Sequence, residues 1–171
     1  MESNIVQPNS SSTIITAFTI NSLASDSTGL VGQQSDEIDL LALNSGNVLD
    51  VLISGLIKTI HTPTPTAGTA SLYAIPRIDD TPTRPDAFGA SDAARTCASI
   101  ARLQSYGRQL WSIATPATVD IPLEMGKVSL ASFFGGFLPR YMTFFLTQNT
   151  AQALNSSGNA FYMTPVWRTV G

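Results

Sequence analysis

Cysteine, histidine and charged residues are scarce in this sequence, and each scarcity excludes a class of protein. The single cysteine, Cys97, allows no intrachain disulfide, so stability must come from packing or from assembly. The single histidine, His61, leaves too few ligands for an ordinary zinc site, which draws on several His or Cys side chains. Charged residues make up 12% of the chain, and Lys and Arg never cluster. We therefore expect no nucleic-acid partner, because cations must cluster to displace counterions from phosphates.

Long apolar runs are missing as well. The most apolar stretch, residues 128–150, is interrupted by Gly135, Gly136, Pro139 and Arg140. It falls short of the roughly 20 apolar residues that a membrane-spanning helix needs. The first residues, MESNIVQPNSSST, contain no basic segment followed by an apolar one, so no secretory signal is expected. The sequence predicts a chain without a membrane contact.

What the sequence does contain is typical of a β-rich protein with a neutral polar surface. The 171 residues suit one domain with a sizeable core. Ten prolines and twelve glycines divide the chain into short segments, and Ser, Thr, Asn and Gln carry most of the polarity. Residues 1–12 show neither a strand period nor a helix period and predict an extended N-terminal arm. Residues 13–171 are expected to form a single β-sandwich domain.

Short segments rich in β-branched and aromatic residues, bounded by Gly, Pro, Asn or Asp, predict strands. The predicted strands are residues 13–21, 36–43, 48–60, 70–79, 108–115, 118–124, 127–134, 139–149 and 159–170. The last two are expected to form a hairpin, because residues 151–159 contain only loop residues. One short helix is predicted over residues 92–103, with Ser91 or Asp92 as its cap. Strands at this spacing favour an all-β fold, an antiparallel β-sandwich of the jelly-roll kind.

The strand predicted at residues 48–60 has two distinct faces. One face is apolar and carries Leu49, Val51, Ile53 and Ile57. The opposite face carries Asp50, Ser54 and Lys58. This alternation predicts a half-buried strand.

The strand within residues 139–149 is apolar on both faces. Met142, Phe144 and Leu146 form one face and are predicted to be core, where each buried side chain contributes about 1.5–3 kcal/mol. Tyr141 and Phe145 face the other way. Either both faces are covered within the domain, or the outer face meets another chain. We assign Tyr141 and Phe145 to a contact surface that is completed by a partner.

Other candidate partner contacts lie earlier in the chain. Phe133 and Phe134 precede the Gly135-Gly136 pair, which predicts a tight bend. In the arm, the candidates are Ile5, Val6 and Pro8. A polar terminus is frayed unless something holds it down, so the arm is expected to dock either on a partner or on its own domain.

The chain offers little catalytic chemistry. A Ser–His–Asp or Cys–His device would need His61, but no nucleophile-elbow motif occurs and Cys97 lacks a recognisable flanking signature. We interpret His61 as an imidazole in a loop or at a strand end. In PRIDDTPTRPD, three acids could offer oxygen ligands to calcium: Asp79, Asp80 and Asp86. Solvated turn carboxylates near Arg77 and Arg84 are the favoured interpretation, and no metal or cofactor is predicted.

The tryptophans could serve as stacking platforms for a carbohydrate. Trp111 and Trp167 both alternate with apolar neighbours inside predicted strands. Placement in the core is therefore the favoured interpretation for both.

The last hundred residues follow a recognisable order of strands and turns. SLYAIPRIDD precedes a loop, and LPRYMTFFLTQNT is followed by Ala153-Leu154, by Gly158-Asn159 and by a final strand. This succession resembles small β-rich structural proteins of tailed bacteriophages. The resemblance rests on loop and turn positions. It departs at TPTRPDAFGASDAARTCASIARL, which is longer and richer in alanine than that pattern.

The resemblance implies a head decoration (cement) protein or a related virion protein. Such a protein would be a non-enzymatic capsid component, which binds the outer surface of the phage head at capsid-subunit junctions and stabilises it. The implied partners are the major capsid protein and neighbouring copies of the chain, with a trimer as one option. The implied location is the virion, assembled in the host cytoplasm. Two alternatives stay open: a tail, neck or fibre component with a recognition role that includes glycan binding, and a hydrolase that uses His61.

Overall fold

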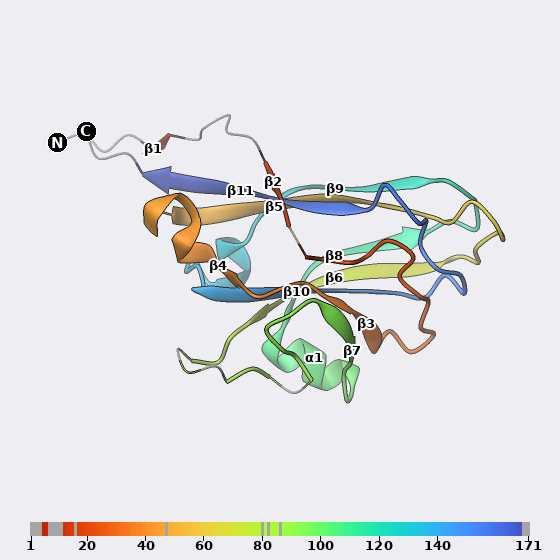
Figure 1. Cartoon of the computed structure of the whole chain (residues 1–171), viewed down its shortest axis with the longest axis horizontal. Helices are drawn as coiled ribbons and strands as arrows, with labels where there is room; N and C mark the ends of the chain where they lie inside the picture. The colour runs from red at the N-terminus through yellow and green to blue at the C-terminus, as the bar shows by residue number, and fades with distance from the viewer. Residues whose placement is uncertain are drawn as a thin grey trace.

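The computed structural model describes residues 5–6, 12–15, 17–46, 48–79, 81, 83–85 and 87–168. Two antiparallel sheets pack face to face, and α1 (Ile100–Tyr106) is the one α-helix among these residues (Figure 1). The predicted all-β sandwich is confirmed. In the described part of the chain, no helix is both long enough and apolar enough to span a membrane. A boundary between an arm of residues 1–12 and a domain of residues 13–171 stays a prediction.

Each sheet is built from strands that are distant in sequence. Sheet A has the order β1-β11-β5-β9, and β2 also pairs with β11. Its strands are β1 (Ile5–Val6), β2 (Thr13–Ile14), β5 (Val48–Lys58), β9 (Pro122–Ser129) and β11 (Ala160–Arg168). Sheet B has the order β7-β3-β10-β6-β8, and β4 also pairs with β10. Its strands are β3 (Val31–Gln34), β4 (Ile38–Asp39), β6 (Gly68–Pro76), β7 (Ala93–Thr96), β8 (Arg108–Thr115) and β10 (Tyr141–Gln148).

The main core lies between the two sheets. Its largest fully buried side chains include Ile53, Ile57, Phe144, Leu146 and Phe161, which occupy alternate positions on β5, β10 and β11. The predicted core face of β10 is thereby confirmed. Leu49 is an exception on β5, because the register shifts between Val166 and Trp167 of the paired strand. Leu49 therefore points outward and Val48 is buried in its place.

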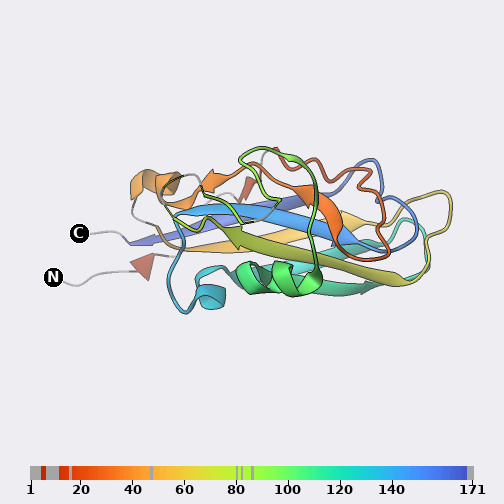
Figure 2. The ribbon, with the colours of Figure 1, turned by 90° about the horizontal axis from the view of Figure 1, so that it is seen from below.

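Sheet B is also covered on its outer face. A second apolar cluster lies there, formed by Tyr73, Ile75, Phe88, Cys97, Leu103 and Phe145. The cover comes from the chain between β6 and β8, which contributes Phe88 and Leu103 of α1, whereas β7 joins the edge of sheet B (Figure 2). Phe88 packs edge-on against Phe145, with ring centroids 5.3 Å apart. The assignment of Phe145 to a partner-contact surface is wrong, because its ring is fully buried inside the chain.

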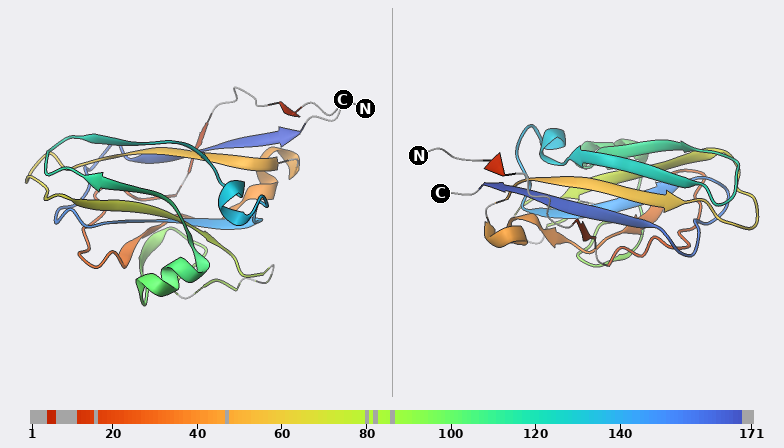
Figure 3. Two further views of the ribbon diagram at one scale, coloured as in Figure 1. Left: turned by 180° about the vertical axis from the view of Figure 1, so that it is seen from behind. Right: turned by 90° about the horizontal axis from the view of Figure 1, so that it is seen from above.

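Among the described residues, the outer face of sheet A is covered only in part: Thr164 is buried there, and its hydroxyl hydrogen-bonds to Ser12 at 2.9 Å. No described element lies over β9, β5 and β11, as the view from above shows (Figure 3). Both sheets carry apolar side chains on their outer faces. Those of sheet B are buried, and those of sheet A, such as Leu52, Leu56 and Tyr162, are at least partly exposed.

Several predicted elements are wrong, and local backbone geometry explains most of them. The strand predicted at residues 13–21 stops at Ile14, and Ala17 has a left-handed φ of 51° that a strand does not allow. The segment predicted as a helix from residue 92 splits into β7 and α1. The cap of α1 is Ser99, whose side chain accepts a hydrogen bond from the backbone of Arg102 at 3.2 Å.

Three further differences concern connections. Residues 36–43 form only the short β4, which leads into the 3₁₀ helix η1 (Leu40–Gly46). The strand predicted at residues 127–134 ends at Ser129 and is followed by the 3₁₀ helix η2 (Ala131–Phe134). The hairpin prediction is wrong, because β10 lies in sheet B and β11 in sheet A. Residues 151–159 cross between the sheets, with Leu154 buried on the way.

The described part of the arm pairs with β11 of the same chain. Val6 lies opposite Trp167, Thr13 lies opposite Met163, and the Ile15 amide donates to the Phe161 carbonyl at 2.8 Å. Because alternate residues of a strand direct their backbone groups to the same side, Pro165 lies at the position where β11 would offer its next donor to the arm. The missing N–H falls between the described pairings of β1 and β2 with β11.

Candidate interaction surface

One end of the sandwich gathers η1, η2, the bend at residues 135–140 and the strand ends that join them (Figures 1 and 3). The Leu40 amide donates to the Arg140 carbonyl at 2.7 Å, and the Leu130 amide donates to the Val51 carbonyl at 2.9 Å. Asp39 caps η1 by accepting from the Leu41 amide at 3.1 Å. These bonds hold the irregular segments on the ends of the sheets.

The bend after η2 depends on two glycines. Gly135 and Gly136 have φ values of 70° and 89°, in the left-handed region that L side chains rarely adopt. The Gly136 amide donates to the Ala131 carbonyl at 2.9 Å and closes η2. The predicted tight bend is confirmed. The turn leaves Phe133 and Phe134 packed against the main core and puts Phe137 outside, where 79% of it is exposed.

Four of the eight large exposed apolar residues in the described chain come from segments that meet at this end. They are Leu41 (37% exposed), Leu49 (46%), Ile78 (64%) and Phe137 (79%), and we call them the apolar end. Exposed apolar side chains that occur singly are ordinary, so what distinguishes these four is that their segments meet at one end of the sandwich.

Tyr141 lies beside the apolar end between two guanidinium groups. The Arg77 Cζ atom is 3.7 Å from the centroid of its ring, and the Arg140 Cζ atom is 4.7 Å away. Arg140 also pairs with Asp39 at 3.1 Å. A cleft of about 300 Å³ opens here and is lined by Arg77, Asp79, Pro139, Arg140 and Tyr141. Tyrosine and arginine are the residue types that carry binding energy most often in protein interfaces.

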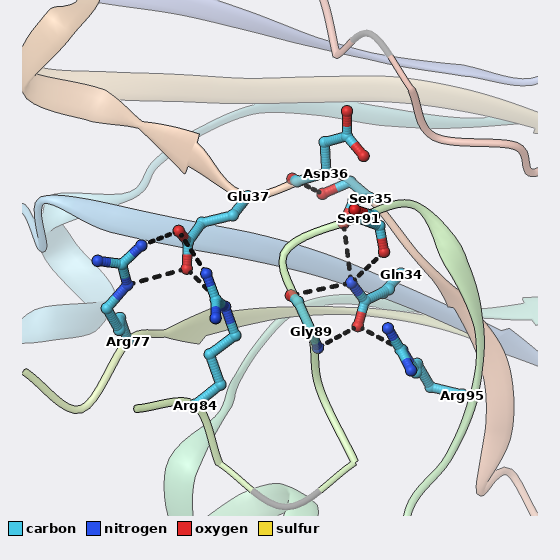
Figure 4. Close-up of polar contacts among 9 residues, drawn as sticks. All are labelled: Gln34, Ser35, Asp36, Glu37, Arg77, Arg84, Gly89, Ser91 and Arg95. Carbon is cyan, nitrogen blue, oxygen red and sulfur yellow. Dashed lines mark hydrogen bonds and ion pairs between the residues drawn. The ribbon is translucent and has the colours of Figure 1, made fainter. Parts of the chain in front are cut away.

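A buried ion cluster holds Arg77 in this position. Glu37 accepts from both Arg77 and Arg84, with Nε–Oε2 distances of 3.0 Å for each arginine (Figure 4). All three side chains are largely buried. Burial raises the pKa of Glu37, but the hydrogen bonds and charges of the two arginines outweigh it and hold the pKa below its usual value. Glu37 therefore stays ionised near neutral pH.

The same region fastens the segment at residues 77–92, which we call the strap. The Gln34 side-chain amide donates to the Gly89 carbonyl at 3.0 Å and to the Ser91 carbonyl at 2.5 Å (Figure 4). Its carbonyl oxygen accepts from the Gly89 amide at 2.9 Å. Arg84 and Phe88 add an ionic and an apolar attachment. The strap thus closes over the second cluster and at the same time positions Arg77.

The structure brings together three of the predicted contact residues. Phe133 and Phe134 lie on η2, Tyr141 is the first residue of β10, and all three are partly buried. Their role in partner binding stays a prediction.

The predicted contacts in the arm are only partly described. Ile5 and Val6 pair through their backbones with Arg168 and Trp167 at the same end of the molecule. Pro8 lies outside the described residues. Sequence reasoning missed Phe137 and Ile78, which are the most exposed of the apolar group. The Gly-Gly pair was the available signal for Phe137, because a left-handed turn separates it from the buried Phe133 and Phe134.

The other candidate residues do not assemble into a site. Asp79 is exposed, and Asp80 and Asp86 lie outside the described residues. Arg77 and Arg84, which are near these acids in sequence, bind Glu37. No group of three His, Cys, Asp or Glu side chains is placed to hold a metal within the described ranges.

His61 lies in a loop beyond β5. Its imidazole contacts Asp120, which also pairs with Lys58 at 3.0 Å and accepts from the Asn155 amide at 3.0 Å. The contact with His61, followed by the one with Lys58, lowers the pKa of Asp120. No described hydroxyl or thiol hydrogen-bonds to the imidazole, so this dyad lacks a nucleophile. Trp111 packs edge-on against Phe161 with centroids 6.1 Å apart, and Trp167 is half-buried on β11.

No family model matches the chain, and neither the curated proteins nor the solved structures contain a similar one.

Proposed function

We propose that this chain is a non-enzymatic structural subunit of a virion, which docks through its apolar end on the outer surface of a phage head and stabilises it. The observation that carries the proposal is the set of exposed apolar residues, Phe137 the most exposed among them, on segments that meet at one end of the sandwich. An apolar centre beside tyrosine and arginine is the usual composition of a protein–protein contact. The resemblance of roughly the last hundred residues to phage structural proteins supplies the kind of partner.

The rigidity of this surface supports the same proposal. Backbone hydrogen bonds and the Glu37 cluster position the end before any partner arrives, so little ordering entropy is lost on binding. The low content of charge suits a subunit that is covered on assembly. The glycan-binding alternative gains no support from Trp111, because its ring packs against Phe161.

The test is co-sedimentation of the purified chain with phage heads that lack it. Phe137→Ser should weaken binding by roughly 30-fold or more, the loss that a central anchor residue typically causes. Folding should be unaffected, because most of the side chain is in water. Ile100→Ser is the matched control, since Ile100 is an exposed apolar residue on α1, away from the apolar end.

Three results would overturn the proposal. The unmodified chain would fail to bind heads at all, or Phe137→Ser would bind as tightly as the unmodified chain. Equal loss in Phe137→Ser and Ile100→Ser would also refute it, because the contact would then not be specific to the apolar end.

A further inference from the structure

Two edge strands lie next to each other along one side of the sandwich, as the view from behind shows (Figure 3). β9 ends sheet A and β8 ends sheet B, and each pairs with a neighbouring strand on one side only. The other side of an edge strand offers a row of N–H and C=O groups with which another chain can pair. Proteins usually block such an edge with proline, with charge, with a bulge or by keeping the strand short.

The outward edge of β9 is blocked in three of these ways. The Thr59 amide donates to the Ile121 carbonyl at 3.1 Å, which fixes the alternation of hydrogen bonds between β5 and β9. Pro122 and Glu124 therefore direct their backbone groups away from β5. Pro122 has no N–H to offer, and Glu124 adds an exposed charge. The register of β9 also shifts opposite residues 53–55, as a bulge requires.

The outward edge of β8 is open from Trp111 to Thr115. The Asn149 amide donates to the Thr69 carbonyl at 3.0 Å, so the odd-numbered residues of β6 bond to β10 and the even-numbered ones bond to β8. Ser112 and Ala114 lie opposite odd-numbered residues of β6 and direct their N–H and C=O groups outward. Both residues are exposed and uncharged, and no described group hydrogen-bonds to these outward backbone groups. The register shift of β8 comes before this segment.

The other outer strands are protected by their length. β7 has four residues, and β1 and β2 have two residues each. In the described part of the chain, β8 is therefore the one long edge strand with an unblocked segment.

We propose that β8 receives an extended segment of the protein on which the apolar end docks, as an additional strand of sheet B. The outward N–H and C=O groups recur at every second residue, a spacing that an extended backbone matches. A helix would not serve, because it satisfies its own backbone groups. This inference rests on the proposed function and names the second element of the same contact.

The position of β8 connects it to the apolar end. Arg108, the first residue of β8, has its Cζ atom 6.0 Å from the ring centroid of Phe134 on η2. β6 and β8 are antiparallel, so the end of β6, which leads to Ile78, lies beside the start of β8. A protein that docks on Ile78 and Phe137 can therefore reach the open edge without crossing the molecule. This continuity makes the docking partner the occupant, and a second copy paired through β8 is the rival that the experiment separates.

The test is co-sedimentation of Ala114→Pro with phage heads that lack the protein. Proline removes the outward N–H and puts its ring where the added strand would lie, whereas pairing with β6 does not use this N–H. Binding should weaken at least about tenfold, because a hydrogen bond is lost and a carbonyl of the partner stays unpaired. Glu124→Pro is the matched control, since it removes an outward N–H from the blocked edge of β9, and it should bind like the unmodified chain. Urea unfolding checks that both variants fold.

Hydrogen exchange of the unmodified chain is a second readout that needs no substitution. The chain exchanges while bound to the head, and the retained amide hydrogens are then measured after release. Those of Ser112 and Ala114 should exchange at least about tenfold more slowly than in the free chain, because strand pairing engages them. The outward amide of Glu124 should exchange at an unchanged rate.

The possible results separate this inference from the proposed function. If folded Ala114→Pro binds like the unmodified chain, or if exchange at Ser112 and Ala114 does not slow, strand addition is refuted, while a loss in Phe137→Ser still supports docking through the apolar end. Equal losses in Ala114→Pro and Glu124→Pro refute a contact specific to β8. A dimer of the isolated chain that Ala114→Pro abolishes in sedimentation velocity would make a second copy the occupant and overturn the inference. Absence of head binding by the unmodified chain refutes both proposals.

Discussion

The outer faces of both sheets carry apolar side chains, but only those on sheet B are buried by the same chain. On sheet B, Tyr73 and Phe145 point away from the main core and are buried by Phe88 and Leu103 of the same chain. On sheet A, Leu52, Leu56 and Tyr162 point away from the core and stay at the surface. The difference is the chain between β6 and β8, which forms the strap, β7 and α1 and lies on sheet B (Figure 2). An apolar residue on the outward side of a strand therefore does not say whether the same chain covers it.

The largest expected loss of stability comes from two adjacent residues of β10, Phe144 and Phe145. Phe144→Ala and Phe145→Ala should each reduce the free energy of unfolding by about 3–5 kcal/mol, because both rings are fully buried. Urea unfolding followed by circular dichroism measures it. A loss below about 1 kcal/mol for Phe145→Ala, the size of an ordinary surface substitution, would show that the second cluster does not cover sheet B in solution.

A smaller effect is expected from the ion cluster that fastens the strap. Glu37→Gln keeps the shape of the side chain but removes the charge that Arg77 and Arg84 bind, and should cost about 2–4 kcal/mol. Opening of the strap should also speed labelling of Cys97, the single cysteine, which is buried beneath it. Glu124→Gln, an exposed change on sheet A, is the control and should alter neither quantity.

The pH dependence of the stability lost in Glu37→Gln tests whether that loss is ionic in origin. Because the folded-state pKa of Glu37 is lowered from 4.5, its stabilisation is fully present above that pH and is lost as the pH falls through the folded-state pKa. The difference in unfolding free energy between the unmodified chain and Glu37→Gln should therefore shrink on acidification. A difference that stays constant down to acid unfolding would contradict an ionic origin.

The smallest effect is expected on the outer face of sheet A. Tyr162→Ala should change the stability of the chain by less than about 1 kcal/mol, whereas Phe161→Ala, one residue away and buried, should cost about 3–5 kcal/mol. Both are measured by urea unfolding followed by circular dichroism. A large loss for Tyr162→Ala would mean that the chain covers this residue after all.

Some of this architecture could be predicted from the sequence, because it depends on neighbouring residues. The two-residue period and the turn residues predicted the strands, and the strand predicted at residues 108–115 coincides with β8. The core face of β10 and the bend at Gly135-Gly136 follow from the same local rules. These features are set within a few residues by backbone sterics and by alternation.

The cover of sheet B could not be predicted in this way, because its parts are distant in sequence. Glu37 meets Arg77 and Arg84 across 40 and 47 residues, and Phe145 meets Phe88 across a comparable distance. A short-range pattern does not encode which strand pairs with which, so the last two strands looked like a hairpin although they lie in different sheets. The sequence by itself determined the strands and their apolar faces. Only the tertiary structure decided which of those faces the chain covers, because burial depends on where the segment between β6 and β8 comes to lie.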